Sequence, residues 1–182
     1  MMFVSLGAGT LVALALITAV SLLTSAGSTP TGGATTTTAP NALVGQSVAG
    51  FHVAGLNGGT IRAPYATGHP TVLIFFASWC GPCQAEMPKV ATYLRAHHGG
   101  AVEVIGVDTN DQRASAQRFV RRVGARFPIV FDATTSVSNG IFQLLALPDT
   151  VFVNAKGVVT RVYIGAIPTT TLAHDIAILA RS

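Results

Sequence analysis

The sequence is poor in the residues that bind structural metals, with 2 cysteines and 5 histidines among 182 residues. A structural zinc site needs about four Cys or His ligands. No histidine lies at a second paired spacing that would complete such a set with the cysteines. We therefore expect neither a metal nor a cofactor, and the cysteines need another explanation.

Charged residues are also scarce, at 10% of the chain, and none precedes Arg62. The net charge of +4 comes from 11 basic and 7 acidic residues. No motif interleaves basic with aromatic residues, so nucleic-acid binding is not expected.

The uncharged N-terminal segment is apolar or small throughout residues 1–26. It fits a cleavable signal peptide, with a small-residue site before position 27. It fits a membrane anchor equally, since a spanning helix needs about 20 apolar residues. No cysteine follows it directly, which excludes a lipoprotein anchor. Both alternatives place the protein outside the cytoplasm, either anchored by the N-terminal helix or secreted after cleavage.

Three regions follow from composition. Residues 1–26 are the signal peptide or anchor, and residues 27–46 are a flexible linker rich in Ser, Thr, Gly and Pro. Residues 47–182 form one globular domain.

Strand and helix patterns alternate within this domain. The expected elements are a hairpin around Asn57-Gly58, strands at 71–76, 102–108 and 127–132, helices at 80–97, 111–124 and 137–145, a hairpin at 149–165 and a closing helix at 169–180. This order predicts an α/β domain: a three-layer sandwich with a mixed central sheet and an N-terminal β-hairpin.

Both cysteines follow the buried strand, two residues apart, where the next helix begins. A disulfide that closes so short a loop contributes little stability. Cys80 in the first turn would have its thiolate stabilised by free N–H groups and the helix dipole, whereas Cys83 would be shielded. One reactive and one shielded thiol are what thiol–disulfide exchange requires.

The motif "WCGPC" at 79–83, followed by "QAEMP" and by Leu147-Pro148 downstream, is similar to the thioredoxin superfamily. It resembles most the exported TlpA/ResA branch, which includes cytochrome c-maturation thioredoxins and is often grouped with the redoxins of the AhpC-TSA type. The likeness covers about residues 48–180. It implies a thioredoxin-like fold and a disulfide oxidoreductase activity, with the antioxidant function associated with redoxins.

The resemblance also implies roles for single residues. Cys80 would be the attacking thiol and Cys83 the resolving thiol. Pro148 would form a cis peptide bond facing the disulfide, and the backbone of Leu147 would pair with the substrate. The residues expected to surround the site and contact the substrate are Trp79, Gly81, Pro82 and Leu147.

The sequence departs from thioredoxin at Ile74, where thioredoxin has a buried aspartate. Glu86, three residues after Cys83, is then expected to be the only carboxylate near enough to serve Cys83 in proton transfer. The alternative is an exposed Glu86 paired with Lys89.

Gly81-Pro82 matches the thioredoxin dipeptide and favours a reductant over an oxidant. The expected partners are exported proteins that carry disulfides, a membrane-embedded thiol donor and the membrane itself, and we expect a monomer. Two alternatives stay open. A peroxiredoxin is disfavoured because Leu73 and Ala77 replace its Pro and Thr. A Sco-type copper chaperone would have more widely spaced cysteines and a distal histidine.

Overall fold

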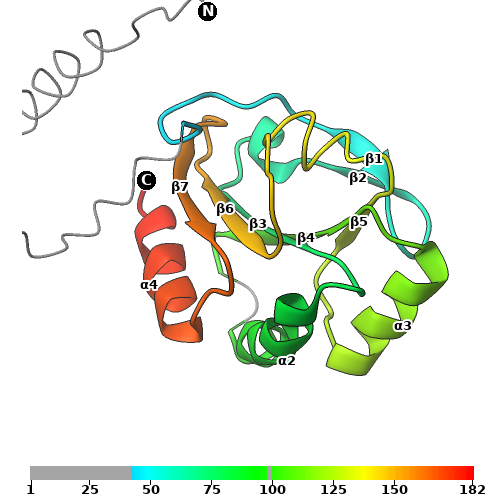
Figure 1. Ribbon diagram of the computed structural model, residues 1–182. Helices are drawn as coiled ribbons and strands as arrows, with labels where there is room; N and C mark the ends of the chain where they lie inside the picture. Colours follow the sequence, from blue (N-terminus) through cyan, green and yellow to red (C-terminus); the bar gives the residue numbers. More distant parts are fainter. Residues whose placement is uncertain (1–41, 98–99) are drawn as a thin grey trace, which may run out of the picture. The chain divides into compact units, whose positions relative to one another are not determined.

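The computed structural model describes residues 42–97 and 100–182 (Figure 1). The expected signal or anchor at 1–26 lies outside these residues, as does most of the expected linker. Within the described ranges, no helix is long and apolar enough to cross a membrane.

A five-stranded mixed sheet forms the centre of the domain, in the order β5-β4-β3-β6-β7. Its strands are β3 (Thr71–Phe76), β4 (Glu103–Thr109), β5 (Ile129–Asp132), β6 (Asp149–Val153) and β7 (Val159–Ile164). The neighbours β3, β4 and β5 run parallel, whereas β6 is antiparallel to both β3 and β7. The central strand β3 is buried along its whole length, as its uninterrupted apolar sequence predicts.

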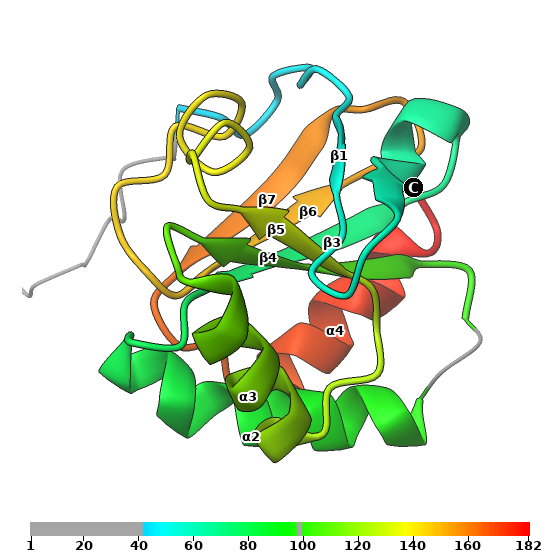
Figure 2. The same ribbon diagram turned by 90° about the vertical axis from the view of Figure 1, so that its right-hand side faces the viewer.

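Three helices cover one face of the sheet (Figure 2). They are α2 (Gly81–Ala96), α3 (Arg113–Val123) and α4 (Thr169–Leu179). Alternate side chains of β3, such as Ile74 and Phe76, pack beneath them. Gly124 ends α3 in the left-handed conformation with φ of 69°, which glycine adopts without strain.

The opposite face of the sheet is covered without an α-helix. The hairpin of β1 (His52–Ala54) and β2 (Thr60–Arg62), the 3-10 helix η1 (Pro64–Thr67) and the segment 133–148 form this layer. Phe51, Tyr65 and Phe142 make edge-to-face ring contacts within it. The three-layer arrangement, the mixed sheet and the N-terminal hairpin are therefore confirmed.

The expected short helix at 137–145 is wrong, because residues 137–142 form turns and residues 143–145 have no regular structure. The carboxylate of Asp132 accepts hydrogen bonds from the backbone N–H groups of Val137 and Ser138. Further along, Phe142 N–H reaches back to Val137 O, one residue beyond the helical i−4 position. Gln143 has a φ of 50°, outside the helical region. The side chain of Asp132 thus competes successfully with the helical pattern.

The folded domain begins earlier than position 47. Gly45 N–H donates to Val159 O at 2.8 Å, and Val48 N–H donates to Gly157 O at 2.9 Å. Leu43 packs against the core on the hairpin side. Residues 43–46, which composition assigns to the linker, therefore contact the β6–β7 hairpin.

Candidate active site

The two cysteines lie at the start of α2. Cys80 is the N-cap residue, with extended backbone angles, and its Sγ accepts a hydrogen bond from Cys83 N–H at 3.2 Å. Pro82 follows in the first turn, where its missing N–H costs no helical hydrogen bond. The sulfur of Cys80 therefore lies where unpaired N–H groups and the helix dipole stabilise a thiolate.

Cys80 and Cys83 form a disulfide, with their Cα atoms 5.2 Å apart. Cys80 retains 5% of its surface exposed and Cys83 retains none. The two cysteine sulfurs therefore differ in their accessibility to a partner. A partner can approach Cys80, whereas Cys83 is reached only through Cys80 or after local movement.

A groove of about 520 Å³ opens beside Cys80. The sequence-predicted residues Trp79, Gly81, Pro82 and Leu147 all line it, and Cys83 does not. The remaining lining residues are Thr109, Asn110, Thr135, Ser138, Asn139, Leu144, Leu145 and Ala146. None of these side chains is charged, so the lining of the groove is neutral.

Leu145 in this groove was not identified by sequence reasoning. Its side chain is 96% exposed, and that of Trp79, which also lines the groove, is 59% exposed. Large apolar side chains with such exposure mark a contact surface when they lie together. The only sequence signal was the apolar run before Pro148, which we assigned to a helix.

The Leu147–Pro148 peptide bond is cis, as the resemblance implies. Pro148 O accepts a hydrogen bond from Gly165 N–H at 2.8 Å, which ties this turn to the end of β7. Leu147 lines the groove, and no hydrogen bond to another described residue uses its backbone N–H or C=O. Both groups are therefore free to pair with a substrate peptide, although that role stays a prediction.

Glu86 lies one turn after Cys83 on α2 and is 4% exposed. Its Oε1 accepts a hydrogen bond from Ile167 N–H at 2.7 Å, while Oε2 is buried with no partner among the described residues. Burial, with a smaller contribution from the charge of Asp149, raises the pKa of Glu86 to about 7 against the opposing effect of the Ile167 bond. Glu86 is therefore buried, and the alternative of an exposed residue paired with Lys89 is wrong.

Asp149 is a second buried carboxyl group near this site, at 3% exposure. It begins β6 directly after Pro148, and its Oδ1 accepts a hydrogen bond from Gly165 N–H at 3.2 Å. Burial raises its pKa to about 6. The expectation that Glu86 is the only carboxylate near enough to serve Cys83 stays a prediction, but Asp149 is close enough to Glu86 to alter its titration. The sequence signal was the acidic residue directly after Pro148.

Ile74, at the thioredoxin aspartate position, lies fully buried in β3 between Gly106 and Thr150 of the neighbouring strands. The buried carboxyl groups described above, Glu86 and Asp149, lie instead on α2 and β6. Among the described residues, no group of three or more His, Cys, Asp or Glu side chains could hold a metal ion.

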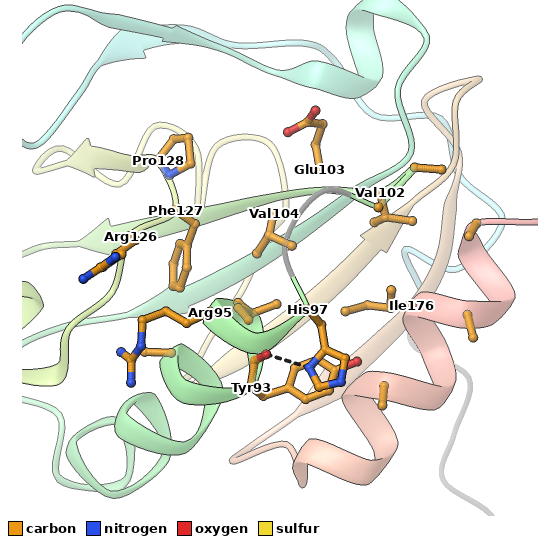
Figure 3. Close-up of a pocket in the computed structure, with 17 residues that line it drawn as sticks. Tyr93, Arg95, His97, Val102, Glu103, Val104, Arg126, Phe127, Pro128 and Ile176 are labelled. Atoms are coloured by element: carbon orange, nitrogen blue, oxygen red, sulfur yellow. Dashed lines mark hydrogen bonds between the residues drawn. The ribbon is translucent and has the colours of Figure 1, made fainter.

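A second cavity of about 590 Å³ lies near the other end of α2, between this helix, the start of β4 and α4 (Figure 3). Apolar side chains such as Val104, Phe127 and Ile176 line it, with Arg95 and Arg126 at one end. No cysteine is among its lining residues. The cavity contributes no group to the dithiol site.

Comparisons with known proteins agree with this geometry. The sequence pattern of the AhpC/TSA family matches residues 44–162. The thiol-disulfide oxidoreductase ResA of Halalkalibacterium halodurans is 32% identical over 124 residues, which cover 68% of this chain and 70% of that protein.

Two solved structures are similar. MTB DsbF, in mixed oxidised and reduced forms, has 30% identity and a TM-score of 0.64, over 71% of this chain and 94% of that one. A secreted Mycobacterium tuberculosis disulfide oxidoreductase, homologous to E. coli DsbE, has 25% identity and a TM-score of 0.62. The match covers 71% of this chain and 96% of that one. The chain therefore belongs to the AhpC/TSA family and, with its disulfide at the start of α2, is a ResA-like thiol–disulfide oxidoreductase of thioredoxin fold.

Proposed function

We propose that the protein is an extracytoplasmic disulfide reductase that acts through Cys80 and Cys83. The observation that carries this proposal is the inequality of the two cysteines. Cys80 caps α2 and faces the neutral groove, while Cys83 is fully buried one turn before the buried Glu86. Such a pair suits an attacking and a resolving thiol.

The first step is attack by the Cys80 thiolate on one sulfur of a client disulfide. A mixed disulfide forms, and the second client sulfur leaves as a thiolate. The helix N-terminus favours the thiolate of Cys80 before attack. The backbone of Leu147 pairs with the client chain and aligns the reacting sulfurs.

The second step releases the client. Glu86 accepts the proton of the Cys83 thiol, and the resulting thiolate attacks Sγ of Cys80. The mixed disulfide breaks, the client leaves with both sulfurs reduced, and two electrons have passed to it. The protein then holds the Cys80–Cys83 disulfide. A pKa of about 7 suits Glu86 to accept and return a proton near neutral pH.

The location outside the cytoplasm is supported by the apolar segment at 1–26 and by the similarity to a secreted disulfide oxidoreductase of Mycobacterium tuberculosis. In this setting a membrane-embedded thiol donor re-reduces the pair, and the enzyme works as a monomer, either anchored or released. Its clients are exported proteins with disulfides. We propose that these clients include apocytochrome c, whose haem-binding cysteines would be reduced, because the chain resembles cytochrome c-maturation thioredoxins.

The redox potential of the cysteine pair tests the direction of the reaction. We expect a value near the roughly −270 mV of thioredoxin, and a value at or above about −150 mV would contradict a reductase. Trapping mixed disulfides with Cys83→Ala in the native host identifies the clients. If all of the trapped proteins were cytoplasmic, the proposed location would be contradicted. Peroxide turnover by Cys83→Ser would instead support the peroxidase alternative.

A further inference from the structure

The two residues before Cys80 are held by the loop between β4 and α3. Ser78 N–H donates to Asp111 Oδ2 at 2.6 Å, and Trp79 Nε1 donates to Asn110 O at 2.9 Å. From the other side, Gln84 Nε2 donates to Ser78 O at 2.7 Å. The position of Cys80 at the helix cap thus depends on Asp111, a residue outside the dithiol motif.

A second carboxyl group, that of Asp108, lies next to Asp111 in the interior of the domain. Asp108 is near the end of β4, fully buried and in register with Phe76 at the end of β3. The charged groups that act on it electrostatically are Asp111, Arg113 at the start of α3 and, most weakly, Asp132 on β5. Two of these three are acidic, so an ionised Asp108 would be opposed by its surroundings.

The protonation of Asp108 decides whether it has a hydrogen-bond partner. When both carboxyl groups are ionised, neither oxygen of Asp108 has a partner among the described residues. When Asp108 is protonated, its hydroxyl can donate to Asp111. A hydroxyl donor to a carboxylate makes a short, strong hydrogen bond, and the buried oxygens are no longer both unpaired.

Asp111 has the acceptor capacity for this arrangement. Its Oδ1 accepts from Gln112 N–H at 2.6 Å, and its Oδ2 accepts from Ser78 N–H. Each carboxylate oxygen has two lone pairs, so an O–H donor from Asp108 need not displace either backbone bond.

We propose that Asp108 and Asp111 share one proton and together position the Ser78–Trp79 segment, and with it the reactive Cys80. Both are positioning residues, because they act through Ser78 rather than on the reacting sulfurs. Burial, followed by the charge of Asp111, raises the pKa of Asp108 to about 8, while Arg113 opposes the rise. The shared proton is therefore present at neutral pH.

Loss of this proton above pH 8 has a defined consequence. Two adjacent carboxylates then repel each other, and the one that can move is Asp111, which lies on a loop. Its movement lengthens the bond to Ser78 N–H and the bond between Trp79 and Asn110. The added negative charge also disfavours a thiolate at Cys80.

The chain's single tryptophan, Trp79, reports on this segment directly. We would titrate its fluorescence in the oxidised protein, in which the cysteines do not ionise. The parent should show a transition with a midpoint near pH 8. Asp108→Asn, which keeps the shape and can still donate to Asp111, should lose that transition. Glu86→Gln, the matched carboxyl-to-amide control, should retain it.

A transition that survives in Asp108→Asn, or is missing from the parent, would overturn the proposal. If Asp108→Asn does not fold, carbon-13 NMR of the Asp carboxyl groups in the parent gives the same answer. One of them must then titrate near pH 8, and titration of all of them below pH 7 would contradict the shared proton.

A further measurement connects the pair to the cysteine. In the reduced protein, Asp108→Asn should remove the contribution near pH 8 from the pH profile of Cys80 alkylation. This inference deepens the proposed function, but the fluorescence and NMR measurements do not depend on it. A protein without reductase activity could still show the shared proton. Failure of the proposed function can therefore be distinguished from failure of the shared-proton proposal.

Discussion

Glu86 in α2 and Asp149 in β6 are two buried carboxyl groups that interact, and the charge of Asp149 helps to raise the pKa of Glu86. Glu86 is anchored by Ile167 N–H and Asp149 by Gly165 N–H, both from the segment that leads from β7 to α4. In the mechanism proposed above, Glu86 accepts the proton of Cys83, and its titration would then depend on the charge of Asp149.

Replacing Glu86 by Gln should slow the resolving step. The amide keeps the shape and can still accept from Ile167 N–H, but it cannot take the proton of Cys83. We expect attack by Cys80 to be nearly unchanged at neutral pH, and resolution to slow by about 10-fold or more. Stopped-flow reduction of a model disulfide separates the two steps. Parent rates in both would show that the proton goes to water instead.

Replacing Asp149 by Asn should shift the pH dependence of resolution to lower pH. The substitution removes a negative charge that raises the pKa of Glu86, and the amide oxygen can still accept from Gly165 N–H. The inflection assigned to Glu86 should therefore move down. Resolution rates measured between pH 5 and 9 test this, and an unmoved or higher inflection would exclude coupling between the two groups.

Glu86 should also make stability depend on pH. Its pKa is raised from 4.5 to about 7, so the fold favours the protonated form. This contribution is fully present below pH 4.5 and is lost as the pH rises through 7. We therefore compare the unfolding free energies of oxidised Glu86→Gln and the oxidised parent. The difference between them should shift in favour of the variant by on the order of 3 kcal/mol from pH 4 to pH 8. Urea denaturation at both pH values measures this.

The control for this measurement is Glu103→Gln, at the exposed first position of β4. Its stability should follow that of the parent within about 0.5 kcal/mol at both pH values. An equal gain in the two variants would mean that the effect comes from net charge and not from burial of Glu86.

Cys80 should be the first thiol alkylated in the reduced protein at neutral pH. It faces the groove and caps α2, whereas Cys83 has no exposed surface. Mass spectrometry after brief treatment with iodoacetamide should locate the first adduct on Cys80. Equal modification of both thiols would refute the assignment of their roles.

Replacing Leu145 by Ser should weaken client binding without weakening the fold, because the side chain is 96% exposed. We expect KM for a protein client to rise by up to about tenfold, the factor that corresponds to 1.4 kcal/mol. The turnover number and the unfolding free energy should stay close to the parent. Ile178→Ser, on the exposed surface of α4 and outside the groove, is the control. A similar rise in both variants would remove the specific role of Leu145.

Sequence alone was sufficient where the determinants are local. The cap at Cys80, the strand that precedes it and the glycine after α3 are all specified by neighbouring residues. The bond from Ser78 to Asp111 joins residues 33 positions apart and depends on the path of the β4–α3 loop. The turns after β5 depend on where Asp132 directs its carboxylate, which no helical periodicity reveals. Asp149 was visible as an acidic residue after Pro148, but its coupling to Glu86 required the strand and the helix to be placed together.

The absence of charged side chains from the lining of the Cys80 groove has a consequence for how clients are found. The lining itself supplies no charge that could attract a client over long range, so we expect encounters close to the roughly 10⁵–10⁶ M⁻¹s⁻¹ typical of unsteered association. Ionic strength, which screens charges, should then have little effect on the capture rate. At the location proposed above, outside the cytoplasm, the enzyme would then capture clients at a similar rate as the external salinity changes.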